Sequence, residues 1–106
     1  IIETIEDMEK NELIGPIVSH AGDGNFHVAL LIDKKNQVEL DKLDSFLVRI
    51  SERAIRMNGT CTGEHGVGQG KRKYMLKELG NAVDVMKKVK NAFDPNKIMN
   101  PGKLFL

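Results

Sequence analysis

The chain has 106 residues, of which 41% are hydrophobic and 29% charged, the balance of an ordinary soluble globular domain. Lysine and arginine (16) nearly match aspartate and glutamate (15), and the resulting charge of +1 argues against a nucleic-acid or anionic-membrane partner. Cys61 is the only cysteine, which excludes an internal disulfide and suits a reducing compartment. We therefore expect a single domain over residues 1–106.

The first predicted element is a helix over residues 2–10, where apolar residues recur at helical spacing among acidic ones. From Ile14 to Ile32 the sequence changes to two apolar and β-branched stretches separated by Asp23-Gly24. This dipeptide between apolar stretches is a strong short-range signal for a β-hairpin. Two antiparallel strands are therefore expected in this segment.

A longer helix is predicted over residues 38–57, because its apolar residues fall on one face and its charged residues on the other. The apolar face comprises Leu43, Phe46, Leu47, Ile50, Ala54 and Met57. Asn58-Gly59 can adopt the left-handed conformation that ends a helix. Residues 60–70 then contain four glycines, which predict an irregular loop.

Two further helices are predicted before a turn-rich end of the chain. Residues 71–79 form a short helix that Gly80 ends, and Asn81 can cap the next helix. The apolar face of that second helix comprises Val85, Met86, Val89 and Phe93. Asp94-Pro95 stops it, and the residues that follow are rich in turn formers. The fold class is therefore α+β, with a helical and turn-rich C-terminal segment.

All three histidines lie in the two glycine-rich segments, outside the predicted helices. With a two-residue or a four-residue turn, His20 stands opposite His27, and their Cβ atoms would be about 4.5–5.5 Å apart. Two imidazoles at that separation can reach one metal ion, and a carboxylate such as that of Glu64 would complete a two-histidine, one-carboxylate site. His65 would then be available as a general base.

Simpler roles for these residues remain open at this point. A histidine near a turn often only makes hydrogen bonds or faces solvent, and Glu64-His65 can be an exposed polar pair in a loop. Lys71, Arg72 and Lys73 can contact an anionic ligand or be an ordinary solvated cluster. The residues alone leave both interpretations standing.

The glycine-rich loop does not match the loops that bind nucleotide phosphates. A Walker loop needs a glycine where His65 stands and a serine or threonine where Arg72 stands. The dinucleotide pattern GxGxxG also fails, because Lys71 occupies the position three residues after Gly68. The sequence therefore argues against a nucleotide site made by this chain alone.

Three segments together carry a family resemblance: HAGDGNFH (20–27), CTGEHGVGQGK (61–71) and DPNKIMNPGKLF (94–105). From about Val18 onward the chain closely resembles the C-terminal domain of FAD-linked oxidases, the family of D-lactate dehydrogenases and of the flavoprotein subunit of glycolate oxidase. The resemblance implies a ferredoxin-like antiparallel sheet packed by helices, as part of a substrate or cap domain. It also implies that the flavin-binding domain is absent from this chain.

The resemblance assigns a role to four residues of the two glycine-rich segments. His20, His27 and Glu64 match the ligands of a divalent metal, zinc or manganese. His65 matches the catalytic base of the family. These assignments favour the metal site over the simpler roles.

Contacts with substrate and cofactor are implied at three more positions. Asn25 and Lys71 are expected near the substrate, and Asn100 near the FAD, which the absent domain would mainly bind. Two departures within the family, Cys61 and Ala29, favour D-lactate over glycolate or 2-hydroxyglutarate. D-lactate is therefore the expected substrate of the full-length enzyme.

The activity implied is oxidation of D-lactate to pyruvate with hydride transfer to the flavin, which a cytochrome or quinone reoxidises. A cytoplasmic enzyme, peripheral to a membrane through its electron acceptor, is expected, and exposed hairpin edges would allow a homodimer. The isolated chain is expected to be inactive. Glycolate is the alternative substrate; a metal-binding interaction module and a metal-dependent hydrolase are alternatives from other classes.

Overall fold

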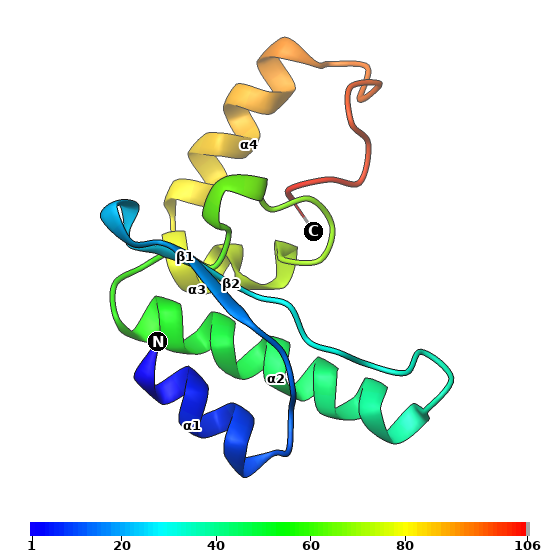
Figure 1. Ribbon diagram of the computed structural model, residues 1–106. Coiled ribbons are helices and arrows are strands. Elements are labelled where there is room, and N and C mark those ends of the chain that lie inside the picture. Colours follow the sequence, from blue (N-terminus) through cyan, green and yellow to red (C-terminus); the bar gives the residue numbers. More distant parts are fainter. Residues whose placement is uncertain (106) are drawn as a thin grey trace. The chain divides into compact units, whose positions relative to one another are not determined.

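The structure is a computed structural model that describes residues 1–105 (Figure 1). The elements in this range are α1 (Ile2–Lys10), β1 (Ile17–His20), η1 (Ala21–Asp23), β2 (Asn25–Val28), α2 (Gln37–Arg56), η2 (Gly63–His65), η3 (Arg72–Tyr74), α3 (Met75–Leu79) and α4 (Ala82–Phe93). The α+β class is confirmed, and the sheet of the described residues has two antiparallel strands. Contacts divide the chain into two compact units, unit 1 over Ile1–Arg53 and unit 2 from Ala54 onward.

Unit 1 is built on a small apolar core that α1 and α2 share with the hairpin. Met8, Leu13 and Phe46 are its buried members. Ile17, Val28, Leu30 and Ile50 pack against them and are partly buried. The predicted helices over 2–10 and 38–57 are thus confirmed, and Phe46 is the residue of the predicted α2 face that the core buries most completely.

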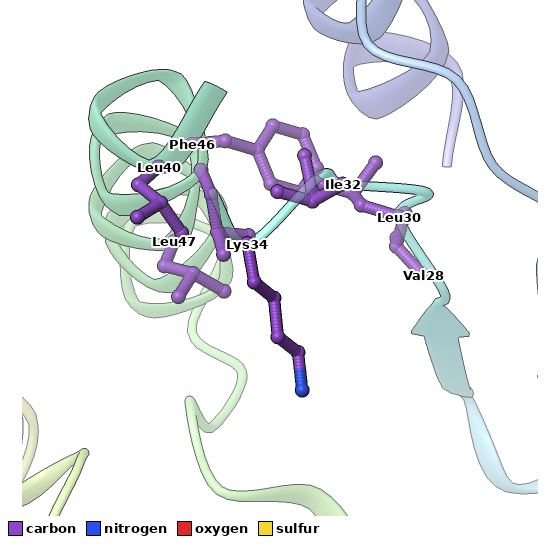
Figure 2. A pocket seen from close by; sticks show the side chains of 8 residues that line it. Val28, Leu30, Ile32, Lys34, Leu40, Phe46 and Leu47 are labelled. Carbon is purple, nitrogen blue, oxygen red and sulfur yellow. The ribbon is translucent and has the colours of Figure 1, made fainter. Parts of the chain in front are cut away.

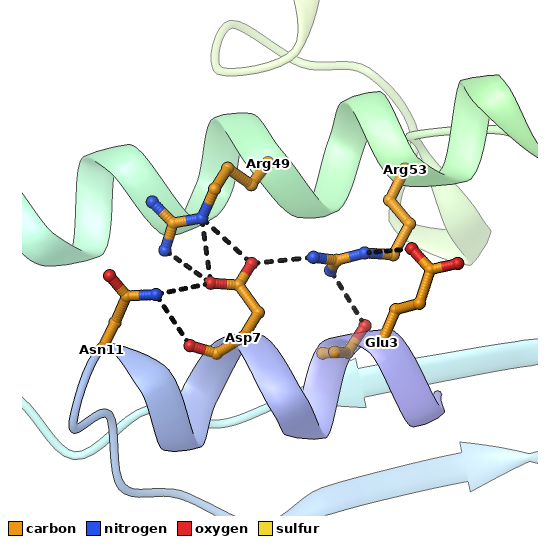
Figure 3. Close-up of polar contacts among 6 residues, drawn as sticks. Glu3, Asp7, Asn11, Arg49 and Arg53 are labelled. Carbon is orange, nitrogen blue, oxygen red and sulfur yellow. Dashed lines mark hydrogen bonds and ion pairs between the residues drawn. The ribbon is translucent and has the colours of Figure 1, made fainter.

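A buried carboxylate joins α1 to α2 within unit 1 (Figure 3). Asp7 accepts hydrogen bonds from Arg49 Nε at 2.9 Å, from Arg53 Nη2 at 2.8 Å and from the Asn11 amide at 2.8 Å. Burial alone would raise the pKa of Asp7, but the hydrogen bonds and charges of Arg49 and Arg53 outweigh it and lower that pKa. Charge pairing therefore reinforces the small apolar core.

A groove of about 410 Å³ opens in unit 1 between α2 and the segment after β2 (Figure 2). Apolar side chains and one lysine line it: Val28, Leu30, Ile32, Lys34, Leu40, Leu43, Phe46 and Leu47. The sequence did not indicate this groove, because its walls come from two segments whose approach depends on the packing of the hairpin against α2.

The hairpin forms as predicted, but its register differs from the predicted one by two residues. His20 pairs with Asn25 and Val18 pairs with His27, so His20 is not directly opposite His27. The reason is the connection: the chain makes a turn of 3-10 helix over Ala21–Asp23, and Gly24 follows in the left-handed region with φ 67°. The residue of β2 that pairs with His20 is therefore Asn25, two residues before His27.

Unit 2 begins with the last turn of α2 and ends in the tail of the chain. Asn58, with φ 58°, provides the predicted left-handed stop, and the Gly59 amide donates to the Ala54 carbonyl at 2.8 Å. Gly80 closes α3 with φ 53°. Asn81 precedes α4 as predicted, although its side chain makes no capping hydrogen bond.

The helix predicted after Asn81 is confirmed as α4, but the described residues leave most of its predicted apolar face exposed. Val85, Val89 and Phe93 are 60%, 53% and 80% exposed, whereas Val83 is only 2% exposed and is the buried apolar residue of the helix. Periodicity identified α4 as amphipathic but could not say which of its apolar residues the rest of the chain would cover. Which apolar residue is buried depends on how the neighbouring segments pack against the helix, and the buried residue is Val83.

Candidate metal and substrate site

The hairpin of unit 1 places two histidines together on one face of its sheet. Side chains alternate between the faces of a strand, and paired residues share a face. Because His20 pairs with Asn25, and His27 lies two residues after Asn25, all three side chains belong to the same face. The rings of His20 and His27 lie edge to face, with centroids 5.7 Å apart and planes at 86°.

This ring separation fits a shared metal ion. Imidazoles that bind one metal through nitrogen at about 2.0–2.1 Å have ring centroids roughly 5–6 Å apart. The observed 5.7 Å lies within that range, and one ring nitrogen of His20 lies within 4.8 Å of one of His27. His20 is exposed and His27 is partly buried, so an ion could reach the pair from solvent. The register correction therefore does not remove the predicted histidine pair.

Unit 2 carries the other predicted polar pair in the glycine-rich loop. Glu64 and His65 lie in the single 3-10 turn of Gly63–His65, and both side chains are exposed. The His65 Nε2 and Glu64 Oε1 atoms are 3.5 Å apart. The loop is irregular as predicted, with Gly66 and Gly68 at φ values of 74° and 53°.

The base of the same loop is fixed by Cys61 and Lys71. The Lys71 ammonium donates to the Cys61 carbonyl oxygen, and the Cys61 amide donates to Glu78 Oε2 at 3.0 Å. Cys61 is 4% exposed, and burial, together with the neighbouring Glu78 carboxylate, raises the pKa of its thiol to about 11. The thiol is therefore protonated and packed at neutral pH, and hydrogen bonds from Lys71 and to Glu78 hold the start of the loop.

Asn100 lies in the tail of unit 2 in a left-handed conformation, with φ 49°. Its carbonyl accepts the Lys103 amide at 3.3 Å, and Asn100 directly follows a turn that Asp94 organises. The structure thus groups His20, Asn25 and His27 in unit 1, and Glu64 and His65 in unit 2.

Arg72 is a residue whose part in this region the sequence did not reveal. It was expected only as one member of a basic cluster at a helix start. Its guanidinium instead donates to the carbonyl oxygens of Gln69, at 3.2 Å, and Gly102, at 2.9 Å. No pattern in the sequence signals this contact, because Gly102 lies 30 residues farther along the chain.

The comparisons with known proteins agree with the resemblance. Residues 1–104 match the family model described as FAD linked oxidases, C-terminal domain. The chain belongs to this family. Of the described residues of this FAD-linked oxidase domain, none forms a helix long and apolar enough to cross a membrane.

Three curated relatives show the degree of similarity. A probable mitochondrial D-lactate dehydrogenase of Danio rerio is 47% identical over 98% of this chain and 21% of its own length. The mitochondrial D-lactate dehydrogenase (cytochrome) 1 of Saccharomyces cerevisiae is 51% identical over 99% of the chain and 18% of its own. Glycolate oxidase subunit GlcD of Bacillus subtilis is 46% identical over 81% of this chain and 18% of its own length. The chain thus spans about a fifth of the length of these relatives.

Proposed function

We propose that this chain is the substrate- and metal-binding part of an FAD-dependent D-2-hydroxyacid dehydrogenase that oxidises D-lactate to pyruvate. The observation that carries the proposal is the histidine pair of unit 1, with ring centroids 5.7 Å apart on one face of the hairpin. Membership of the FAD-linked oxidase family supports the reaction class, and the names of the D-lactate dehydrogenase relatives support the substrate.

In this proposal His20, His27 and Glu64 hold one divalent metal ion, zinc or manganese. Two neutral imidazoles and one carboxylate form a donor set that both metals accept, with positions left open for a substrate. When bound, the ion supplies positive charge that polarises the carboxylate and hydroxyl oxygens of a 2-hydroxy acid. The three ligand residues fix the position of the ion and thereby the position of the substrate.

His65 takes the proton of the substrate hydroxyl. It lies beside Glu64 in sequence, and its exposed ring can exchange the proton with water after each turnover. A base next to a metal ligand in the same 3-10 turn lies close to the substrate that the metal orients. Loss of the hydroxyl proton favours departure of the Cα hydrogen as hydride.

Asn25 and Lys71 bind the substrate, and Asn100 contacts the FAD. Asn25 shares the hairpin face with both histidines, which supports a place near the bound acid. FAD, when bound, supplies the hydride acceptor. A cytochrome or quinone then serves as the electron acceptor, and we propose a cytoplasmic protein that forms a homodimer through its hairpin edges.

Calorimetry with zinc and manganese tests the metal site. Wild type is compared with His20→Ala and Glu64→Ala, and Glu12→Ala serves as the control because Glu12 is exposed and pairs with Lys42. We expect stoichiometric binding by wild type and the control, and at least tenfold weaker binding by the two ligand variants. Binding that is equal in all four proteins, in the chain and in the full-length enzyme, would show that the metal assignment is wrong.

Glycolate is the second candidate substrate, and the relative named glycolate oxidase subunit GlcD favours it. The values of kcat/KM for D-lactate and glycolate in the full-length enzyme discriminate the two. The methyl group of D-lactate is worth about 1–3 kcal/mol in a pocket shaped to hold it, which corresponds to a preference of roughly 10–200-fold. A higher kcat/KM for glycolate would replace D-lactate as the proposed substrate.

A further inference from the structure

The tail of the chain is hydrogen-bonded to the glycine-rich loop of unit 2. The Leu104 amide donates to the Gly68 carbonyl at 2.8 Å. Arg72 bridges the same two segments, because its guanidinium donates to Gln69 in the loop and to Gly102 in the tail. These bonds join segments more than 30 residues apart in sequence.

The glycine-rich loop has little packing of its own to hold it. A Cβ atom added at Gly66, Gly68 or Gly70 would meet no atom within 4 Å. At these three glycines no neighbouring atom packs against the side of the backbone where a side chain would lie. Its order therefore depends on hydrogen bonds, and the bonds to the tail are among them.

The start of the tail is also held by hydrogen bonds, which centre on Asp94. The Asp94 carboxylate is 3% exposed and accepts the amides of Ile98, at 2.9 Å, and Met99, at 3.0 Å. The Lys90 ammonium binds the same carboxylate and donates to the Met99 carbonyl at 2.7 Å. A helix that ends at Phe93 thus carries a clamp that fixes the first turn of the tail.

The backbone of the tail shows that its contacts determine its shape. Lys97, Asn100 and Leu104 all have positive φ, at 54°, 49° and 67°. Asparagine adopts this region more readily than other non-glycine residues, but for leucine it is rare and strained, so surrounding contacts must compensate the strain at Leu104. The bond from the strained Leu104 to Gly68 is such a contact, so the tail acts as a brace with a defined conformation.

We infer that Arg72 is a positioning residue that, together with the tail over residues 98–105, holds the glycine-rich loop in the conformation that presents Glu64 and His65. The inference rests on the proposed function for the roles of those two side chains. The restraint itself rests on the hydrogen bonds of Arg72 and Leu104 alone. In this inference Arg72 acts through its hydrogen bonds to backbone carbonyls and is assigned no direct contact with the metal or the substrate.

The test compares Arg72→Met with Lys73→Met in the full-length protein. Methionine keeps an apolar stem of similar length but removes every donor. Lys73 is the neighbouring cation, and its ammonium lies over the Tyr74 ring, 5.2 Å from the ring centroid. Hydrogen exchange of the Leu104 amide, which donates to the Gly68 carbonyl, and of the loop amides up to Lys71, which donates to the Val67 carbonyl, is measured by mass spectrometry. Zinc and manganese affinities are measured by calorimetry, and the melting temperature reports global stability.

For Arg72→Met we expect about tenfold faster exchange of the Leu104 amide and of the loop amides in residues 63–71, about tenfold weaker metal binding and little change in exchange across α4. Lys73→Met is expected to match wild type in all three measurements. Unchanged exchange of the loop in Arg72→Met would overturn the inference. If Arg72→Met shows faster loop exchange but the wild-type protein binds no metal, the role of the tail as a brace is supported and the metal assignment is refuted.

A milder variant keeps the test decisive if Arg72→Met does not fold. Gly102 has φ 70° and open space around it, so Gly102→Ala strains the backbone without a clash and displaces the carbonyl that Arg72 binds. Gly70→Ala is the matched control, because it also has open space and its φ is not positive. Faster loop exchange in Gly102→Ala alone supports the brace, and equal exchange in both variants refutes it.

Discussion

Replacement of Asp7 by asparagine is expected to destabilise unit 1 by about 2 kcal/mol at pH 7. Removing one partner of a fully buried ion pair costs about 3–5 kcal/mol. The Asp7 side chain is 7% exposed and that of Arg53 15%, but that of Arg49 is 36% exposed, so water screens part of the interaction. Asparagine also retains an oxygen that can accept one of the hydrogen bonds.

The effect of Asp7→Asn should depend on pH in a defined direction. The pKa of Asp7 is lowered from its ordinary value of 3.8, so its stabilising contribution is complete above that value and is lost as the pH falls through the lowered pKa. The difference between wild type and Asp7→Asn is therefore expected to be largest at neutral pH. It should shrink below about pH 4, because asparagine does not titrate.

Urea unfolding followed by circular dichroism at pH 7 and pH 3 measures both effects. Glu12→Gln is the matched control, because Glu12 and Lys42 also form a pair, at 3.1 Å, but their side chains are 85% and 37% exposed. The control is expected to cost less than about 0.5 kcal/mol. Equal losses for Asp7→Asn and Glu12→Gln, or a difference that grows as the pH falls, would refute this reasoning.

Three further predictions follow from single sites. Gly15→Ala should destabilise the hairpin by about 1–3 kcal/mol in thermal unfolding, because its Cβ would overlap the Ala29 carbonyl oxygen, whereas Gly22→Ala has open space and should be neutral. Alkylation of Cys61 by iodoacetamide at pH 8 should be about 100-fold slower than that of a thiol of pKa 9.0, and Glu78→Gln should accelerate it. The purified 106-residue chain should reduce no flavin with D-lactate. Turnover of D-lactate by this chain would contradict the proposal that it binds metal and substrate while another domain mainly binds the FAD.

The sequence by itself determined which elements form. The helices and the hairpin follow from local periodicity and turn residues, and such signals depend on neighbours within a few positions. The histidine pair also survived an error in register, because a shift of two residues keeps every side chain on its face. A shift of one residue would have separated His20 from His27.

The tertiary structure alone decided how those elements use their surfaces. The turn of 3-10 helix over Ala21–Asp23 set the register, and local patterns did not distinguish it from a shorter turn. The choice of Val83 over Phe93 as the buried residue of α4 depends on which segments pack there. The contact between Arg72 and Gly102 joins positions 30 residues apart. Because every residue carries a backbone carbonyl oxygen, the residue type at position 102 does not indicate that this oxygen accepts a hydrogen bond.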